Sequence, residues 1–258
     1  MIRGVLLDLS GVLYQGDHAL PGAVAAVERL RAAGLPIRFI TNVTRKGSHG
    51  VLRHLGGMGF EIPPDDLLSA PIAARRYLEQ RGLHPYLLVH PALEDEFADL
   101  ISDAPDAVLV GDAADGFTYA ALNRAFRLLI DGAPLLAMGN NRYFREDDGL
   151  SLDIGPFVAA LEYASGATAT VLGKPAPAFF HAALESLDCE PEETVMVGDD
   201  ALADVDGALA GGCQGILVQT GKYRPGDEEQ ITRPGAVLVP DIAAAVDWIL
   251  PHSSRAAL

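Results

Sequence analysis

Short apolar runs alternate with segments of helical periodicity along most of the chain. Residues 2–7 are nearly all apolar, which is typical of a strand buried on both faces of a sheet, and residues 36–41 are a second predicted strand. Between them, Val24, Val27 and Leu30 recur at helical spacing, and Gly34 stands where that helix would end. With further helices expected over residues 48–55 and 71–81, the alternation predicts βαβ units around a parallel sheet.

A second α/β region is expected between residues 83 and 166. Its strands are predicted over residues 86–89, 107–110 and 135–137, and its helices over residues 94–101, 119–130 and 157–164. The buried-strand pattern then resumes at residues 170–172, 194–197 and 215–218, with helices over residues 177–187, 205–210 and 242–250. We therefore predict a discontinuous core domain of residues 1–80 and 168–258, and a smaller α/β domain of residues 81–167 inserted into it.

The charge balance limits the partners of the chain. Its 19 Lys and Arg residues face 35 Asp and Glu residues, a formal net charge of −16, which argues against a nucleic-acid-binding surface. No apolar run reaches the roughly 18 residues needed to cross a bilayer, and Asp8 interrupts the first run too early for a signal peptide. We expect a cytoplasmic location and no nucleic-acid or membrane partner. Any anionic substrate must be attracted by a local feature such as a metal ion or a helix N-terminus.

Polar residues follow several of the predicted strands. Asp8 ends the first strand, Thr41-Asn42 the second, Lys174 follows residues 170–172, and Asp199-Asp200 follow residues 194–197. Because ligands bind at the carboxyl edge of parallel strands, we expect these side chains to gather there.

Carboxylates dominate that edge. The segment VMVGDDALAD puts Asp199, Asp200 and Asp204 in one turn and helix, and carboxylates that face Asp8 repel unless a divalent cation offsets them. Oxygen ligands of this kind suit Mg²⁺, which is therefore the predicted cofactor. In the plainer alternative, Asp200 and Asp204 only cap the next helix, and an isolated Asp8 forms a turn.

Three other residues offer contacts to a phosphoryl group. Thr41 supplies a hydroxyl, Asn42 an amide and Lys174 an ammonium group. A lone lysine is more often a solvated surface residue, but one among four features at the same edge is better explained as a phosphate-binding group.

In order, DLSGVLY, FITN, GKP and VGDDALAD resemble the four motifs of the haloacid dehalogenase-like (HAD) superfamily, in its phosphatase branch. The resemblance covers almost the whole chain and implies a Rossmann-like parallel-sheet core with a large inserted α/β cap of the C2 type. More narrowly, PYLLVH, the stretch from GNNRYF to LEYASG, and QTGKYRPGDE are similar to the phospholysine phosphohistidine inorganic pyrophosphate phosphatases.

This resemblance implies a role for each motif residue. Asp8 would be the nucleophile that forms an aspartyl-phosphate, and Asp8, the carbonyl of Ser10 and Asp199 would hold Mg²⁺. Thr41, Asn42 and Lys174 would bind the transferred phosphoryl group. Asp204 would orient Lys174 or a metal-bound water without contacting the substrate, and Asp200 would also lie outside the direct contacts. A homodimer formed through the caps is a further expectation from the resemblance.

One position departs from the family pattern. Most of these phosphatases have a second aspartate in the first motif, which protonates the leaving group, and this chain has Ser10 there. A hydroxyl cannot replace a carboxyl group that contributes about 10²–10⁴-fold to the rate. Either the substrates have good leaving groups, such as phosphoramidates, pyrophosphate or aryl phosphates, or the protein is a low-turnover phosphate-binding regulator or scaffold.

Two segments of the inserted domain call for interpretation. Asn141 and Arg142 follow a predicted strand and are expected to face the substrate, although an Asn-rich surface turn explains them equally well. Gly111-Asp112 in VLVGDAADG repeats the sequence around Asp199, but we expect an ordinary turn at the end of a strand there.

Overall fold

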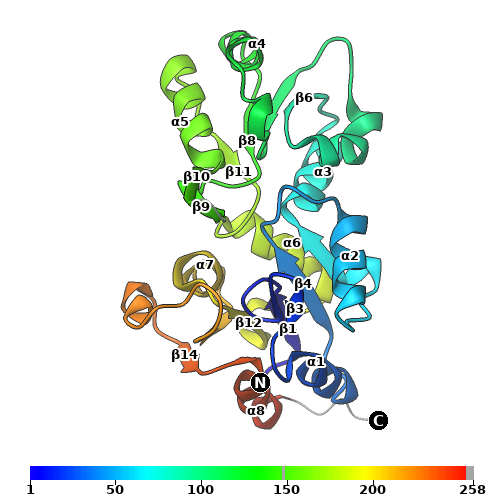
Figure 1. The fold of residues 1–258 in the computed structure, drawn as a ribbon, viewed down its shortest axis with the longest axis vertical. Coiled ribbons are helices and arrows are strands. Elements are labelled where there is room, and N and C mark those ends of the chain that lie inside the picture. Colours follow the sequence, from blue (N-terminus) through cyan, green and yellow to red (C-terminus); the bar gives the residue numbers. More distant parts are fainter. Residues whose placement is uncertain (147–148, 254–258) are drawn as a thin grey trace. The chain divides into compact units, whose positions relative to one another are not determined.

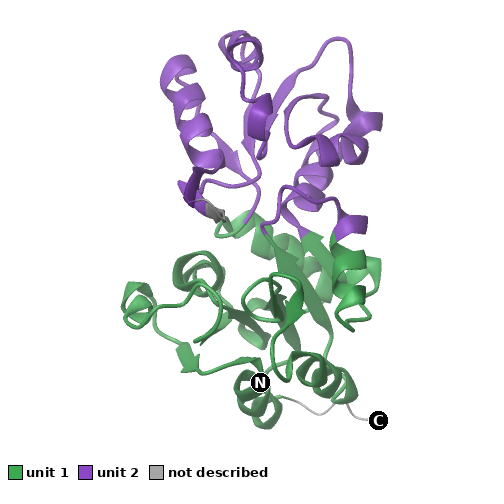
Figure 2. Cartoon of the chain, viewed as in Figure 1, with its two compact units in different colours: residues 1–41, 51–68, 174–258 green, residues 42–50, 69–173 purple. Residues whose placement is uncertain are grey.

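The computed structural model describes residues 1–146 and 149–253, with no side chains described at residues 145 and 146. The chain divides into two compact units, coloured separately in Figure 2. Unit 1 comprises residues 1–41, 51–68 and 174–258, and unit 2 comprises residues 42–50 and 69–173. Helix α3 therefore belongs to unit 2 by its contacts, whereas the sequence prediction placed residues 71–80 in the core.

The described part of unit 1 is built on one sheet of six strands, in the order β14-β13-β12-β1-β4-β5. Strands β14, β12, β1 and β4 are labelled in Figure 1. The pairs from β14 to β4 are parallel. The central strand β1 has the sequence GVLLD and is buried at all its positions, as a strand covered on both faces should be. The strands are β1 (Gly4–Asp8), β4 (Ile37–Thr41), β5 (Leu67–Ser69), β12 (Thr194–Gly198), β13 (Gln214–Val218) and β14 (Ala236–Val239).

Helices cover the sheet of unit 1. Helix α1 packs against α8, and α6 packs against α7 and β4. A π-helical segment, η5, leads directly into α7. The helical elements are α1 (Ala23–Ala32), α2 (Ser48–Gly57), α6 (Pro177–Leu187), η5 (Ala201–Asp206), α7 (Gly207–Ala210) and α8 (Ile242–His252), with short 3₁₀ turns at η1 (Pro64–Asp66), η4 (Pro191–Glu193) and η6 (Asp227–Gln230).

Unit 2 has a smaller parallel sheet, which in its described residues has the order β11-β8-β7-β6. Its apolar core surrounds β7, whose residues are all buried, and α4 packs against α5 beside it. The elements are α3 (Ala70–Arg81), β6 (Pro85–Leu88), η2 (Pro91–Leu100), β7 (Ala107–Val110), η3 (Ala114–Gly116), α4 (Tyr119–Ile130), β8 (Leu135–Ala137), α5 (Ile154–Ser165) and β11 (Thr170–Val171).

Two antiparallel hairpins complete the fold. Strands β9 (Tyr143–Glu146) and β10 (Gly149–Leu152) pair in unit 2, and β2 (Tyr14–Gln15) pairs with β3 (His18–Ala19) in unit 1. No described helix is both long enough and apolar enough to traverse a bilayer. The predicted α/β class with a parallel-sheet core is confirmed.

One predicted strand belongs to the other sheet. We expected residues 170–172 to continue the core sheet, but β11 pairs with β8 at the edge of the sheet of unit 2. The residues of β11 are exposed or half-buried, unlike those of β1. An apolar run indicates a strand without specifying its partner, so the prediction was wrong about the sheet to which this strand belongs.

Candidate active site

Asp8 ends the central strand of unit 1 and is only 6% exposed. The chain turns sharply after it. The Gly11 N–H donates to the Tyr14 carbonyl at 2.7 Å, and Gly11 has a φ of 87°, which an L side chain rarely adopts. Ser10, which forms a β-bridge with Tyr14, is exposed in this turn. The turn holds the carboxylate at the carboxyl edge of the sheet.

Lys174 lies between two carboxylates. Its Nζ donates to Asp8 Oδ1 at 2.5 Å and to Asp204 Oδ1 at 2.6 Å. Burial alone would lower the pKa of this lysine, but the negative charges of Asp204 and Asp8 outweigh it and raise the pKa above its ordinary value. The two carboxylates therefore favour the charged form of Lys174 beside Asp8, although this lysine follows a strand of the other sheet.

Asp199 and Asp204 come from the turn and helix after β12, the strand beside β1. Burial, followed by the charges of Asp8 and Asp204, raises the pKa of Asp199 to about 7. Burial also raises the pKa of Asp204 to about 6, with Lys174 opposing and Asp8 contributing to the rise. Asp8 thus disfavours the ionised form of both carboxylates, and Asp204 further disfavours that of Asp199.

Asp200 has a different function in the same segment. Its Oδ1 accepts the N–H groups of Leu202 and Ala203 at 3.1 and 2.9 Å, which caps the N-terminus of η5. Its own N–H donates to Asp204 Oδ2 at 3.1 Å. The capping alternative therefore holds for Asp200, while Asp204 turns its other oxygen to Lys174.

The acidic cluster fits a divalent cation. Carboxylate oxygens of Asp8, Asp199 and Asp204 all lie within 4.8 Å of one another. These three buried oxygen donors, two of them with raised pKa values, are a set that a hard divalent ion would stabilise. The predicted ligand set contains the Ser10 carbonyl where this cluster has Asp204, whose Oδ1 is already bound to Lys174.

The loop of residues 220–222, which the sequence analysis did not assign to the site, contacts both Asp199 and the turn that follows Asp8. The N–H of Lys222 donates to Asp199 Oδ2 at 2.7 Å, and Thr220 Oγ1 donates to the Gly11 carbonyl at 2.5 Å. A Cβ atom on Gly221 would overlap Asp199 Oδ2 and the Cα of Gly11, so the close approach requires glycine. The signal was present in the sequence, because TGK follows a predicted strand with its carboxyl end at the same edge.

The remaining predicted residues divide between the units. Thr41 ends β4 and is 2% exposed; it lies one residue beyond Ile40, the partner of Asp8 in the parallel register. Asn42, Asn141 and Arg142 belong to unit 2, where Asn141 and Arg142 are exposed. The structure thus brings Asp8, Thr41, Lys174, Asp199 and Asp204 to one edge of unit 1. The roles of all the predicted site residues stay predictions.

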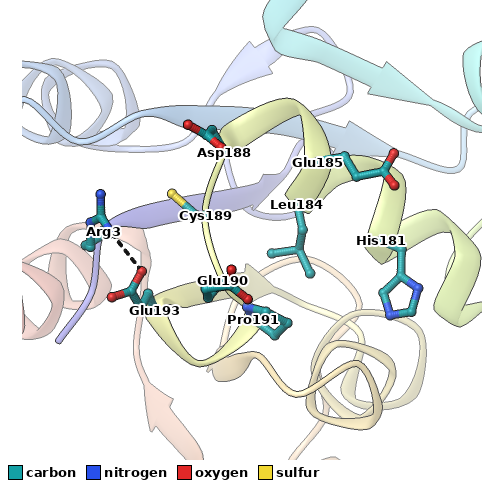
Figure 3. Close-up of a pocket in the computed structure, with 9 residues that line it drawn as sticks. All are labelled: Arg3, His181, Leu184, Glu185, Asp188, Cys189, Glu190, Pro191 and Glu193. Atoms are coloured by element: carbon teal, nitrogen blue, oxygen red, sulfur yellow. Dashed lines mark hydrogen bonds and ion pairs between the residues drawn. The ribbon is translucent and has the colours of Figure 1, made fainter.

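A hollow of about 690 Å³ in unit 1 is a poor place for a phosphate group (Figure 3). It includes Arg3, which precedes β1 and so lies at the strand end opposite Asp8. Arg3 forms an ion pair with Glu193 at 3.0 Å. The acidic lining residues outnumber Arg3 and His181; they are Glu185, Asp188, Glu190 and Glu193. Their charge would repel an anion.

Comparisons with known proteins agree with this geometry. The model of a family described as haloacid dehalogenase-like hydrolase matches residues 5–103, and a HAD-hydrolase-like model matches residues 171–245. A rat protein named haloacid dehalogenase-like hydrolase domain-containing protein 2 is 46% identical over 252 residues, covering 98% of this chain and 97% of its own. Bovine phospholysine phosphohistidine inorganic pyrophosphate phosphatase is 41% identical over 260 residues, covering 98% and 96%.

A solved structure is similar over nearly the same extent. The 4-nitrophenylphosphatase of Thermotoga maritima superimposes with a TM-score of 0.87 at 27% identity, covering 95% of this chain and 97% of its own. Its fold matches both the parallel-sheet core and the inserted unit described above. The chain therefore belongs to the haloacid dehalogenase-like hydrolase family and is an enzyme of the phosphatase kind that these relatives represent.

Proposed function

We propose that this enzyme hydrolyses small phosphorylated compounds with good leaving groups, using Mg²⁺ and a covalent aspartyl-phosphate on Asp8. The observation that carries the proposal is the position of Lys174. Its ammonium group joins the carboxylates of Asp8 and Asp204, inside a cluster that Asp199 completes. A nucleophile, a fixed cation and a set of oxygen donors for a metal ion thus lie at one sheet edge.

In the first step, the Asp8 carboxylate attacks phosphorus. A bond forms between an Asp8 oxygen and phosphorus, and the bond to the leaving group breaks, with its electron pair departing on the leaving group. Lys174 supplies positive charge to the phosphoryl oxygens, and the proposed contacts of Thr41 and Asn42 orient them. Bound through Asp8, Asp199 and the Ser10 carbonyl, Mg²⁺ would supply further positive charge to the same group.

In the second step, a water molecule attacks the phosphorus of the aspartyl-phosphate. The bond between phosphorus and Asp8 breaks, which releases inorganic phosphate and restores the carboxylate. Of the two protons of that water, one stays on phosphate and the other ends on the leaving group or in solvent. Asp204 fixes Lys174 through both steps, because its Oδ1 accepts from Nζ at 2.6 Å and its Oδ2 accepts from the Asp200 N–H.

Ser10 restricts the substrates. It stands where most relatives in this family have an acid, and a hydroxyl group does not protonate a leaving group at neutral pH. We therefore propose phosphoramidates such as phospholysine and phosphohistidine, pyrophosphate and aryl phosphates as the substrate class. The predicted homodimer and cytoplasmic location stay predictions, as does the absence of nucleic-acid and membrane partners.

The test is phosphate release from pyrophosphate, phospholysine, p-nitrophenyl phosphate and a sugar phosphate, each with Mg²⁺ and with EDTA. Release that requires both Mg²⁺ and Asp8, and that favours P–O–P and N–P bonds, supports the proposal. The Asp8→Asn variant is the control. Preferential release from the sugar phosphate would contradict the substrate class while leaving the mechanism in place.

The alternative, a phosphate-binding regulator or scaffold, is favoured by Ser10 and predicts a different time course. Phosphate would appear in a single burst, with a trapped aspartyl-phosphate and no steady turnover. A second variant, Ser10→Asp, separates the two. If leaving-group protonation is what the enzyme lacks, turnover of alkyl phosphate monoesters should rise more than turnover of pyrophosphate. Equal gains on both substrates would contradict that explanation.

A further inference from the structure

Lys222 is fixed beside the acidic cluster by its backbone. It follows β13, the neighbour of β12, so it reaches the same edge of the sheet as Asp199. Its N–H donates to Asp199 Oδ2 at 2.7 Å, and Gly221 before it packs against Asp199 and Gly11. The position of the Lys222 Cα is therefore set by the site itself rather than by a free surface loop.

The side chain of Lys222 remains available to a ligand. It is 70% exposed, and its Nζ lies 3.7 Å from Asp200 Oδ2, which is too long for a hydrogen bond. An exposed ion pair of this kind is worth little, so the ammonium group can give it up for a better partner. Partial burial of the group is outweighed by the charges of Asp200 and Asp199, which raise the pKa and keep it charged.

The cluster thus has two cations in different environments. Lys174 is 4% exposed and hydrogen-bonded to Asp8 and Asp204, the arrangement expected for contact with the group being transferred. Lys222 is exposed and associated with the outer carboxylate, Asp200. A substrate with one anionic group would contact Lys174 alone, whereas a substrate with two anionic groups would have a second cation, Lys222, to contact.

We propose that Lys222 determines leaving-group specificity: its ammonium group binds an anionic leaving group, so that the site favours diphosphates over compounds with an uncharged leaving group. This inference rests on the proposed function. It also accounts for Ser10, because a leaving phosphate needs no protonation if a nearby cation offsets its charge. Inorganic pyrophosphate is the simplest substrate of this class.

The kinetic test compares pyrophosphate with phosphoramidate, which transfers the same phosphoryl group but releases ammonia. The Lys222→Met variant should lower kcat/KM for pyrophosphate by about 10- to 100-fold, the size expected when a charged hydrogen bond is lost. The value for phosphoramidate should change by less than about 3-fold. Lys222→Arg keeps the charge and should recover part of the activity toward pyrophosphate.

A matched control removes the same charge from the same loop. Arg224 lies two positions further along and is exposed, and no ion pair within the described residues joins it to an active-site carboxylate. The Arg224→Met variant should therefore leave the ratio of the two kcat/KM values unchanged. All assays need saturating Mg²⁺, because removing a cation near Asp199 and Asp200 strengthens the attraction of metal ions.

A binding measurement gives a readout without turnover. Calorimetry would compare methylenediphosphonate, a diphosphate analogue that is not hydrolysed, with inorganic phosphate. Lys222→Met should weaken the diphosphonate by about 10-fold or more and leave phosphate within about 3-fold. Equal loss for both ligands would mean that Lys222 acts on the site as a whole rather than on the second anionic group, and no loss would mean that it binds neither ligand; each result would overturn the proposal.

The two proposals fail in distinguishable ways. A wild-type protein that hydrolyses neither substrate contradicts the proposed function, and the calorimetric comparison then decides the role of Lys222 by itself. A wild-type protein that hydrolyses both, with the same kcat/KM ratio in Lys222→Met, supports the proposed function and overturns the inference about Lys222.

Discussion

Each unit has a strand that ends in nearly the same sequence, but the aspartate at its end has acidic neighbours in unit 1 and an arginine neighbour in unit 2. VMVGD runs through β12 to Asp199 in unit 1, and VLVGD runs through β7 to Asp112 in unit 2. Both aspartates are buried, at 2% and 5% exposure. Asp199 faces the carboxylates of Asp8 and Asp204, whereas Asp112 Oδ2 accepts from Arg45 Nε at 2.5 Å.

The comparison shows that neighbours, not local sequence, decide the chemistry of a buried carboxylate. Asp112 is paired with Arg45, and its Oδ1 accepts the Ala114 N–H at 3.0 Å, which closes a turn. Arg45 is held further by the ring of Phe144, 4.5 Å away. Asp199 has an acidic environment instead, and its pKa rises to about 7. A divalent metal ion would stabilise the second arrangement, whereas Arg45 already offsets the charge of Asp112 in the first.

The largest expected difference between the two sites is in activity. Asp199→Asn should lower the Mg²⁺-dependent rate by about 10²–10³-fold, because it removes a charge that would hold the metal ion at the reacting group. Asp112→Asn should leave the rate within about 3-fold, because its partner is a structural arginine. Initial rates of phosphate release at saturating Mg²⁺ measure both. Comparable losses in the two variants would show that Asp112 does more than close a turn.

The same pair of variants should change stability in opposite directions when no metal ion is bound. In EDTA at pH 8, Asp112→Asn loses a charged contact to Arg45 and should lower the free energy of unfolding by about 1–2 kcal/mol. Asp199→Asn removes repulsion with Asp8 and Asp204 and should raise it by on the order of 1 kcal/mol. Urea denaturation of wild type and both variants provides the measurement.

The control for that experiment is Mg²⁺ itself. Adding it should stabilise the wild type and Asp112→Asn by similar amounts and should stabilise Asp199→Asn much less, since binding to the folded state alone shifts the unfolding equilibrium. If Asp199→Asn were the less stable variant in EDTA, the idea that the carboxylates of unit 1 destabilise one another would be wrong.

Much of the fold follows from apolar runs and helical spacing. The strand predicted over residues 107–110 and the helix predicted over residues 119–130 match the bounds of β7 and α4. Strand β14 was missed although its sequence, AVLV, is identical to that of β7, so four apolar residues do not by themselves decide whether a strand lies at the edge or in the core of a sheet. The partner of β11 was also beyond prediction, because pairing is decided by tertiary packing rather than by the strand sequence.

The candidate site could be predicted in part for a similar reason. Asp8 and Asp199 end buried strands, and the carboxyl ends of neighbouring parallel strands must lie together. The position of TGK after a predicted strand indicated only that Lys222 lies near this edge; its contact to Asp199 uses the backbone N–H, which a side-chain pattern does not reveal. The close approach of Gly221 to Gly11 likewise depends on space between two loops far apart in sequence.

The last expected effect is the pH dependence of metal-induced stabilisation. The pKa values of Asp199 and Asp204 rise from 3.8 to about 7 and about 6, so the folded protein holds these protons more tightly than the unfolded chain. Their contribution to stability is present in full below about pH 4 and is lost as pH rises through 6 and 7. Mg²⁺ needs the ionised carboxylates, so it should stabilise the protein more at pH 8 than at pH 5.5.

Thermal unfolding with Mg²⁺ and with EDTA at each pH measures that gain. Displacing a proton costs about 1.4 kcal/mol for each pH unit below the pKa, so the gain at pH 8 should exceed that at pH 5.5 by on the order of 2 kcal/mol. In Asp112→Asn the same pH dependence should persist, because Asp112 is paired with Arg45 and is not part of the acidic cluster. In Asp199→Asn it should shrink, because one of the two titrating groups is gone. A gain that is equal at both pH values would mean that the carboxylates of the cluster are already ionised without metal. The two Val-Gly-Asp turns would then differ in the contacts of their aspartates, and not in the protonation of the acidic cluster.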